Sequence, residues 1–146
     1  MTRPGTAALL AAALTLTACE DVTDPGGLGT FTLVEANGQP LPSVVFDGDT
    51  EFGHMVATAT AGSITLRGDN RFTERLTVDI VLEGAPLGEE TVAVSGDYNV
   101  DGQLVSFDPE QAGSVDFTGT LSGDGTVLTT LEEDPEFGTL DLLWEQ

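Results

Sequence analysis

The chain has 146 residues and a formal net charge of −21, because 25 acidic residues outweigh four arginines. The length predicts one domain, and the charge disfavours nucleic acid and anionic lipid headgroups as partners. Cations and basic proteins are favoured instead. Apolar residues make up 40% of the chain, and their regular spacing predicts a folded domain rather than a disordered acidic one.

The N-terminal segment joins Arg3 to a short apolar run over residues 7–18. The run is too short for a membrane-spanning helix, which needs about twenty residues, and is typical of a helical signal peptide. It ends in the sequence LTAC, which resembles the lipobox of bacterial lipoproteins. The resemblance implies cleavage between Ala18 and Cys19 and lipidation of Cys19, with palmitate as a suitable label. The alternative is an ordinary secretory peptide with a chance cysteine.

An acidic segment rich in Gly and Pro follows Cys19 and predicts a flexible tether. We therefore divide the chain into a lipoprotein signal peptide (1–18), a lipidated cysteine with its acidic tether (19–28) and a folded domain (29–146). Cys19 is the only cysteine, so the domain has no internal disulfide and its core must supply the stability. The lipid on Cys19 would anchor the protein to a membrane of the cell envelope, at the periplasmic face or the cell surface.

From residue 29 onward, apolar and polar residues alternate with a period of two, which predicts β-strands. Turn sequences such as Asn37-Gly38 and Asp101-Gly102 separate the runs and favour tight hairpins. The pattern predicts an all-β, antiparallel up-and-down meander of about eight to nine strands in a barrel or a sandwich, and barrel closure removes exposed edges. The expected strands are 30–35, 55–60, 63–67, 71–83, 90–99, 103–107, 114–121, 126–131 and 138–145, and the count of eight to nine allows for neighbouring segments that merge into one strand.

Four stretches resemble the small lipocalin-like domains of bacterial lipoproteins. They are GTFTLVEANGQPLP, SITLRGDNRF, SGDYNVDGQLVSF and GTLSGDGTVLTT, in this order along the chain. The resemblance implies a lipocalin-like β-barrel and carries over no catalytic residue. Phe31 stands where true lipocalins have the tryptophan that plugs the closed end of the barrel.

Three arginines flank one predicted hairpin and, by strand parity, point outward: Arg67, Arg71 and Arg75. They form a candidate anion-binding patch. The alternative is a solvated face on which the arginines pair with neighbouring acids.

Glu74 falls on the apolar face of its predicted strand, where an unpaired carboxylate is costly. It marks the barrel mouth, a bulge that shifts the register, or a contact with a polar ligand. The aromatic residues expected inside the barrel are bulky: Phe31, Phe72, Tyr98, Phe117 and Trp144. They predict a filled or shallow interior. If a ligand enters, it is small and apolar and passes the mouth near Glu74.

Asp47, Asp49 and Glu51 place three carboxylates within five residues and form a weak calcium candidate. We expect them to be a solvated loop. His54 is the only histidine and Cys19 is consumed by lipidation, so a zinc cluster and a Cys–His nucleophile pair are excluded. The sequence contains no Gly-x-Ser-x-Gly elbow. We expect no catalytic residue, metal or cofactor.

The sequence therefore predicts a lipid-anchored, monomeric β-barrel protein of the cell envelope. It acts as a non-catalytic binding or structural module, with a basic protein as the partner suited to its surface. The first alternative is a carrier of a small apolar ligand in the barrel interior. The second, more distant alternative is a hydrolase-type enzyme.

Overall fold

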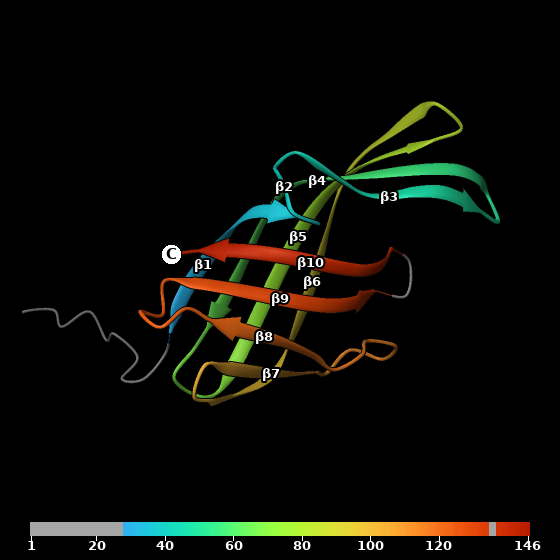
Figure 1. Ribbon diagram of the computed structural model, residues 1–146. Helices are drawn as coiled ribbons and strands as arrows, with labels where there is room; N and C mark the ends of the chain where they lie inside the picture. Colours follow the sequence, from blue (N-terminus) through green and yellow to red (C-terminus); the bar gives the residue numbers. More distant parts are fainter. Residues whose placement is uncertain (1–27, 135–136) are drawn as a thin grey trace, which may run out of the picture.

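The described residues, 28–134 and 137–146 of a computed structural model, form β-strands joined by turns and loops (Figure 1). The strands are β1 (Gly29–Ala36), β2 (Gln39–Pro40), β3 (Ser43–Thr50), β4 (Gly53–Leu66), β5 (Arg71–Leu82), β6 (Ala85–Asp101), β7 (Leu104–Pro109), β8 (Phe117–Leu121), β9 (Val127–Asp134) and β10 (Gly138–Glu145). From β3 to β10, each strand pairs antiparallel with the next. The predicted all-β meander is confirmed. The predicted signal peptide and Cys19 lie outside the described residues.

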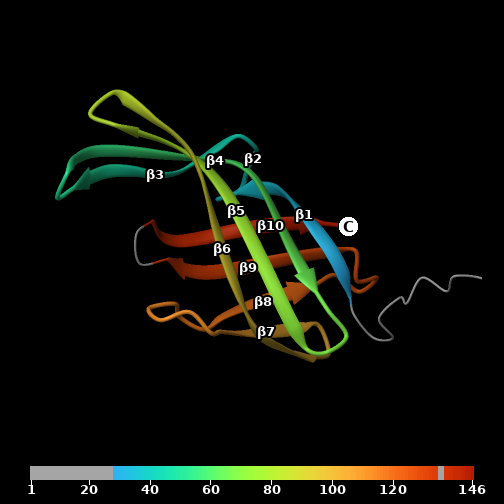
Figure 2. The same cartoon turned by 180° about the vertical axis from the view of Figure 1, so that it is seen from behind.

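The first strand closes the barrel by pairing with two partners. Residues 29–32 of β1 pair with β4, and residues 32–36 pair with β10. The pairing with β10 contains a register shift between Leu33 and Glu35. Eight strands, β1 and β4–β10, therefore form a closed barrel, and β2 and β3 are additional strands. Seen from behind, β1 lies beside β4 (Figure 2).

The barrel is filled by its own side chains. The five predicted interior aromatic residues are all buried, and Phe31, Phe72 and Trp144 are fully so. Phe107 joins Phe72 and Phe117 in a cluster with ring centroids 4.4–5.8 Å apart. Each such aromatic pair contributes about 0.5–1.5 kcal/mol beyond its burial. The aromatic cluster thus occupies the place that a ligand would take in a hollow barrel.

The strand bounds differ from the expected ones at two places, for identifiable reasons. Segments 55–60 and 63–67 are one strand, β4, whose register shifts between Ala59 and Ala61. This bulge reverses the alternation of inward and outward residues, so the sequence resembles two short strands. The acidic stretch Asp47–Thr50, expected in a loop, lies on β3, which pairs with β4. An edge strand tolerates such charges because one of its sides faces solvent.

The strands of the barrel differ greatly in length. Strands β4, β5 and β6 have 14, 12 and 17 residues, whereas β7–β10 have five to eight. The extra residues of β4, β5 and β6 extend beyond the barrel, and β3 lies beside β4 in this projecting part (Figure 1). The β3–β4 and β5–β6 hairpins therefore project from one end of the molecule. They are joined because β4 and β5 stay paired as far as Met55 and Leu82.

Strand β6 runs past the end of β7, and a side chain takes the place of the missing strand. The amide of Gln111 donates to the Ala93 carbonyl at 2.8 Å and accepts from the Ser95 N–H at 3.0 Å. The Ser95 carbonyl accepts from the Glu110 N–H at 2.9 Å. The loop after β7 thus supplies the hydrogen bonds that β7 no longer makes.

A close approach between β6 and β7 gives a prediction about Gly96. A Cβ added there would lie 2.0 Å from the Asp108 carbonyl oxygen, so Gly96→Ala forces the two strands apart. We expect Gly96→Ala to lower the free energy of unfolding by about 1–3 kcal/mol, measured by urea denaturation. Gly123→Ala is the control, because its nearest neighbour, Gln103 Nε2, would be 3.7 Å away. Equal losses in the two variants would contradict the proposed backbone clash.

Candidate functional site

Glu74 lies inside the barrel, as its place on the apolar face predicted, and is only 4% exposed. It is paired with Ile64 on β4 and Val94 on β6, and β5 shows no register shift on either side of it. The alternative of a bulge at Glu74 is therefore wrong. Glu74 lines two small cavities of about 50 and 40 Å³ together with Glu132. These volumes suit a few water molecules and are far below the roughly 300–1,000 Å³ of ordinary ligand sites.

A chain of hydrogen bonds leads from the core to these cavities. The Trp144 indole N–H donates to Thr130 Oγ1 at 3.0 Å, and the Thr130 hydroxyl donates to Glu132 Oε1 at 2.7 Å. Phe46 of β3 packs against Phe137 with ring centroids 6.3 Å apart, and Phe137 also lines the smaller cavity. The interior near Glu74 is thus narrow and polar. In the described part of the chain, no buried side-chain nitrogen or oxygen lacks a hydrogen-bond partner.

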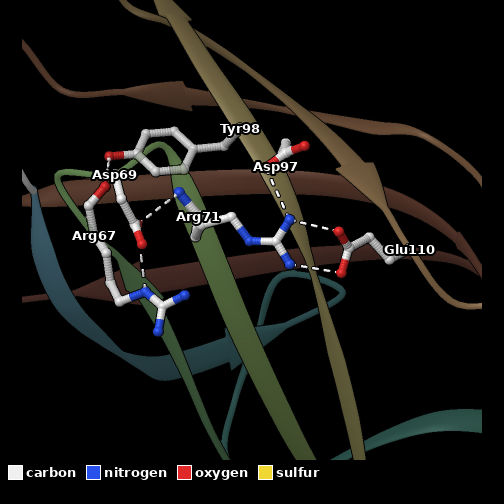
Figure 3. Close-up of polar contacts among 6 residues, drawn as sticks. All are labelled: Arg67, Asp69, Arg71, Asp97, Tyr98 and Glu110. Carbon is white, nitrogen blue, oxygen red and sulfur yellow. Dashed lines mark hydrogen bonds and ion pairs between the residues drawn. The ribbon is translucent and has the colours of Figure 1, made fainter.

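The three predicted surface arginines do not act as one patch. Arg71 forms a two-pronged ion pair with Glu110, with both N–O distances 2.5 Å, and a further contact of 2.9 Å with Asp97 (Figure 3). Arg67 Nε lies 3.5 Å from Asp69 Oδ1. Arg75 is exposed and, within residues 28–134 and 137–146, makes no ion pair. The geometry favours the alternative of a solvated face paired with acids.

The network around Arg71 is structural. Besides pairing with Arg67, Asp69 accepts a hydrogen bond from the Arg71 N–H at 3.1 Å, and the Tyr98 hydroxyl donates to the Arg67 carbonyl at 2.7 Å (Figure 3). The side-chain hydrogen bonds from Arg71 lower the pKa of Glu110, and those to Glu110 and Asp97 raise the pKa of Arg71. Both partners are therefore charged at neutral pH.

The acidic stretch on β3 directs two of its carboxylates to one imidazole. His54 Nε2 lies 3.1 Å from Asp47 Oδ1, and His54 Nδ1 lies 3.3 Å from Asp49 Oδ1. Glu51 is in the turn that follows β3. In the described part of the chain, no group of three or more His, Cys, Asp or Glu side chains could hold a metal ion. The weak calcium candidate gains no support from this arrangement.

The two projecting hairpins enclose an apolar groove that the sequence did not reveal. Its volume is about 480 Å³. The floor consists of Met55 on β4 with Ile80 and Leu82 on β5, and the walls are Phe52 and Leu87. These last two side chains are 74% and 65% exposed. The sequence signal for this groove was a large apolar side chain at each hairpin, Phe52 and Leu87. Their proximity could not be predicted, because it depends on the pairing of β4 with β5.

The rim of this groove is acidic. Glu51 and Glu90 line its edge. Glu83, at the tip of the β5–β6 hairpin, accepts a hydrogen bond of 2.6 Å from the His54 N–H, and its own N–H donates to the His54 carbonyl at 2.8 Å. This reciprocal pair fastens the two hairpins to each other. The groove is thus built on a hydrogen-bonded four-stranded sheet rather than on loops.

Comparison with known proteins identifies no family for this chain. No protein-family model matches it, and no curated protein is significantly similar to it in sequence. In the described part of the chain, no helix is both long and apolar enough to cross a membrane.

The Arg71–Glu110 pair predicts a pH dependence of stability. Glu110 has a lowered pKa in the folded protein, so the pair's contribution is complete above the ordinary pKa of 4.5 and is lost as the pH falls through the lowered pKa. We expect Arg71→Gln to lower Tm by a few degrees at neutral pH and by less in acid. Thermal unfolding measured from neutral pH to acid tests this. Arg75→Gln is the control, and a deficit in Arg71→Gln that stays constant with pH would contradict the assignment.

Proposed function

We propose that this protein is a lipid-anchored, non-catalytic interaction module of the cell envelope, whose binding surface is the exterior of a packed β-barrel. The observation that carries the proposal is the filled interior. Phe72, Phe107 and Phe117 form one packed cluster. Trp144 is fully buried, and its indole N–H donates a hydrogen bond to Thr130. A barrel filled in this way acts as a rigid support for what it displays outside.

The alternative of a carrier for a small apolar ligand is less well supported. An eight-stranded barrel is wide enough either to be filled by side chains or to hold one small ligand. Here the cavities beside Glu74 total only about as much space as a few water molecules. A buried carboxylate next to these cavities also disfavours an apolar occupant. A concave apolar surface of about 480 Å³ lies outside the barrel, between the hairpins.

The anchor part of the proposal rests on the sequence around Cys19. A single acyl chain gives marginal membrane binding, whereas two or more hold a protein stably. The acidic tether after Cys19 would keep the strongly negative domain away from anionic headgroups. A tethered module of this kind meets its partners at the membrane surface.

Titration with apolar ligands separates the packed module from the carrier. Fatty acids and an apolar dye are added to the protein while Trp144 emission is followed. Because Trp144 is buried in a filled interior, we expect blue-shifted emission and no saturable response. A fatty-acid carrier measured in parallel shows that the assay works. Stoichiometric, saturable quenching at micromolar ligand would contradict the packed-barrel proposal.

Replacing the lipidated residue tests the anchor. Cys19→Ser removes the thiol that forms the thioether, so we expect loss of palmitate labelling and loss of the protein from the membrane fraction. The measurement is metabolic labelling with fractionation of host cells expressing each form. Undiminished labelling of the Cys19→Ser protein would show that the lipobox interpretation is wrong.

A further inference from the structure

The apolar face that lines the barrel continues beyond it into the groove, where Met55 is still buried and Ile80 and Leu82 are half-buried. Within the barrel, Ala57 on β4 and Val78 on β5 are fully buried. Two residues further along these strands, the same face carries Met55 and Ile80, which form the floor of the groove. The opposite wall, β7–β10, is too short to reach them. The groove is therefore a stretch of core face that the barrel itself leaves open.

Charge distinguishes between the occupants that could cover this face. The hairpin residues 43–59 and 78–92 contain no Lys or Arg. Their carboxylates include Asp49, Glu51, Glu83, Glu89 and Glu90. A second copy of the chain would bring the same carboxylates into contact, and an anionic membrane surface would also be repelled. The acidic tether that follows Cys19 is disfavoured for the same reason.

We propose that the groove docks a segment of a partner protein that carries apolar side chains flanked by Lys or Arg. This inference rests on the proposed function, because it names the surface and the partner class of the interaction module. The apolar side chains occupy the space between Phe52 and Leu87, and the basic ones pair with Glu51 and Glu90. A volume of about 480 Å³ accommodates a few such side chains. Large apolar residues in pockets surrounded by polar rims are the usual anchors of protein interfaces.

A designed peptide tests the two requirements separately. The probe is a fluorescein-labelled twelve-residue peptide of alternating leucine and lysine, titrated against the full chain in a mild detergent and followed by anisotropy. One comparison peptide replaces leucine by serine, and another replaces lysine by glutamate. We expect saturable binding of the leucine–lysine peptide that weakens with added salt. Both comparison peptides should bind at least about tenfold more weakly.

Paired variants place the binding at the groove. Phe52→Ser combined with Leu87→Ser removes both walls, and because these side chains are exposed the fold is retained. We expect this to weaken peptide binding at least about tenfold. The matched control is Leu104→Ser combined with Leu131→Ser, which removes exposed apolar side chains from β7 and β9. It should leave the affinity unchanged, and since every arm contains the same detergent, peptide partition into micelles contributes equally.

Charge reversal tests the rim. Glu51→Lys combined with Glu90→Lys should abolish binding of the leucine–lysine peptide and permit binding of the leucine–glutamate peptide. Asp101→Lys combined with Glu145→Lys changes the net charge by the same amount at exposed positions outside the groove lining and should retain the original preference. Equal effects of both charge reversals would overturn the proposal, because binding would then follow net charge alone.

The remaining outcomes also decide. Absence of leucine–lysine binding at millimolar peptide, or equal binding of the serine–lysine peptide, overturns the docking of an apolar basic segment. A dimer in sedimentation that dissociates in the Phe52→Ser/Leu87→Ser protein would show that a second copy occupies the groove, which also overturns it. Failure of the packed-barrel proposal is detected separately, by the response of Trp144 to fatty acids, which the groove variants do not alter.

Discussion

The structure depends on the way β1 divides its backbone hydrogen bonds between β4 and β10. This double pairing turns a ten-stranded sheet into a closed barrel, because without it residues 29–32 of β1 and residues 63–66 of β4 would each present an unpaired edge. Closure with eight strands fixes the interior to a width that side chains can fill. The large side chains that point inward, Trp144 and Phe72 among them, then leave only small cavities beside Glu74.

The same closure determines what lies outside. The last part of β4 and the first part of β5 belong to the barrel wall, whereas the first part of β4 and the last part of β5 lie outside it. Paired with β3 on one side and β6 on the other, they continue as a small four-stranded sheet beyond the barrel. The barrel wall opposite this sheet ends earlier, so the apolar face inside the barrel continues into the groove, which Phe52 and Leu87 border with exposed side chains. The groove between the hairpins thus results from the length of these strands rather than from a specialised loop.

Much of the fold could be predicted from the sequence because its signals are local. Alternation along β5 and β10 identified the buried face, and Asn37 and Gly38 adopt the positive φ angles that a tight hairpin requires. The continuity of β4 was not predicted, because the bulge near Ala61 reverses the alternation of inward and outward residues inside this strand. The strand β3 was missed because its acidic residues are typical of a loop.

The candidate sites were harder to predict, because they depend on partners far apart in the sequence. The position of Glu74 followed from strand parity alone. Its proximity to Glu132 could not be predicted, because it results from closure of the barrel. The pairing of Arg71 with Glu110 was also hidden, since it spans 39 positions. The groove joins Phe52 to Leu87 through the pairing of β4 with β5. No periodicity within either hairpin contains that information.

The side chain of Gln111 has a consequence for the behaviour of this protein in a crowded compartment. Its carboxamide uses one N–H as a donor and its oxygen as an acceptor, and it occupies the Ala93 carbonyl and the Ser95 N–H of β6. A strand from another molecule that approached this edge would find those positions already taken. Gln111 therefore shortens the unpaired edge of β6 that another strand could join, because unpaired strand edges are the templates for intermolecular pairing.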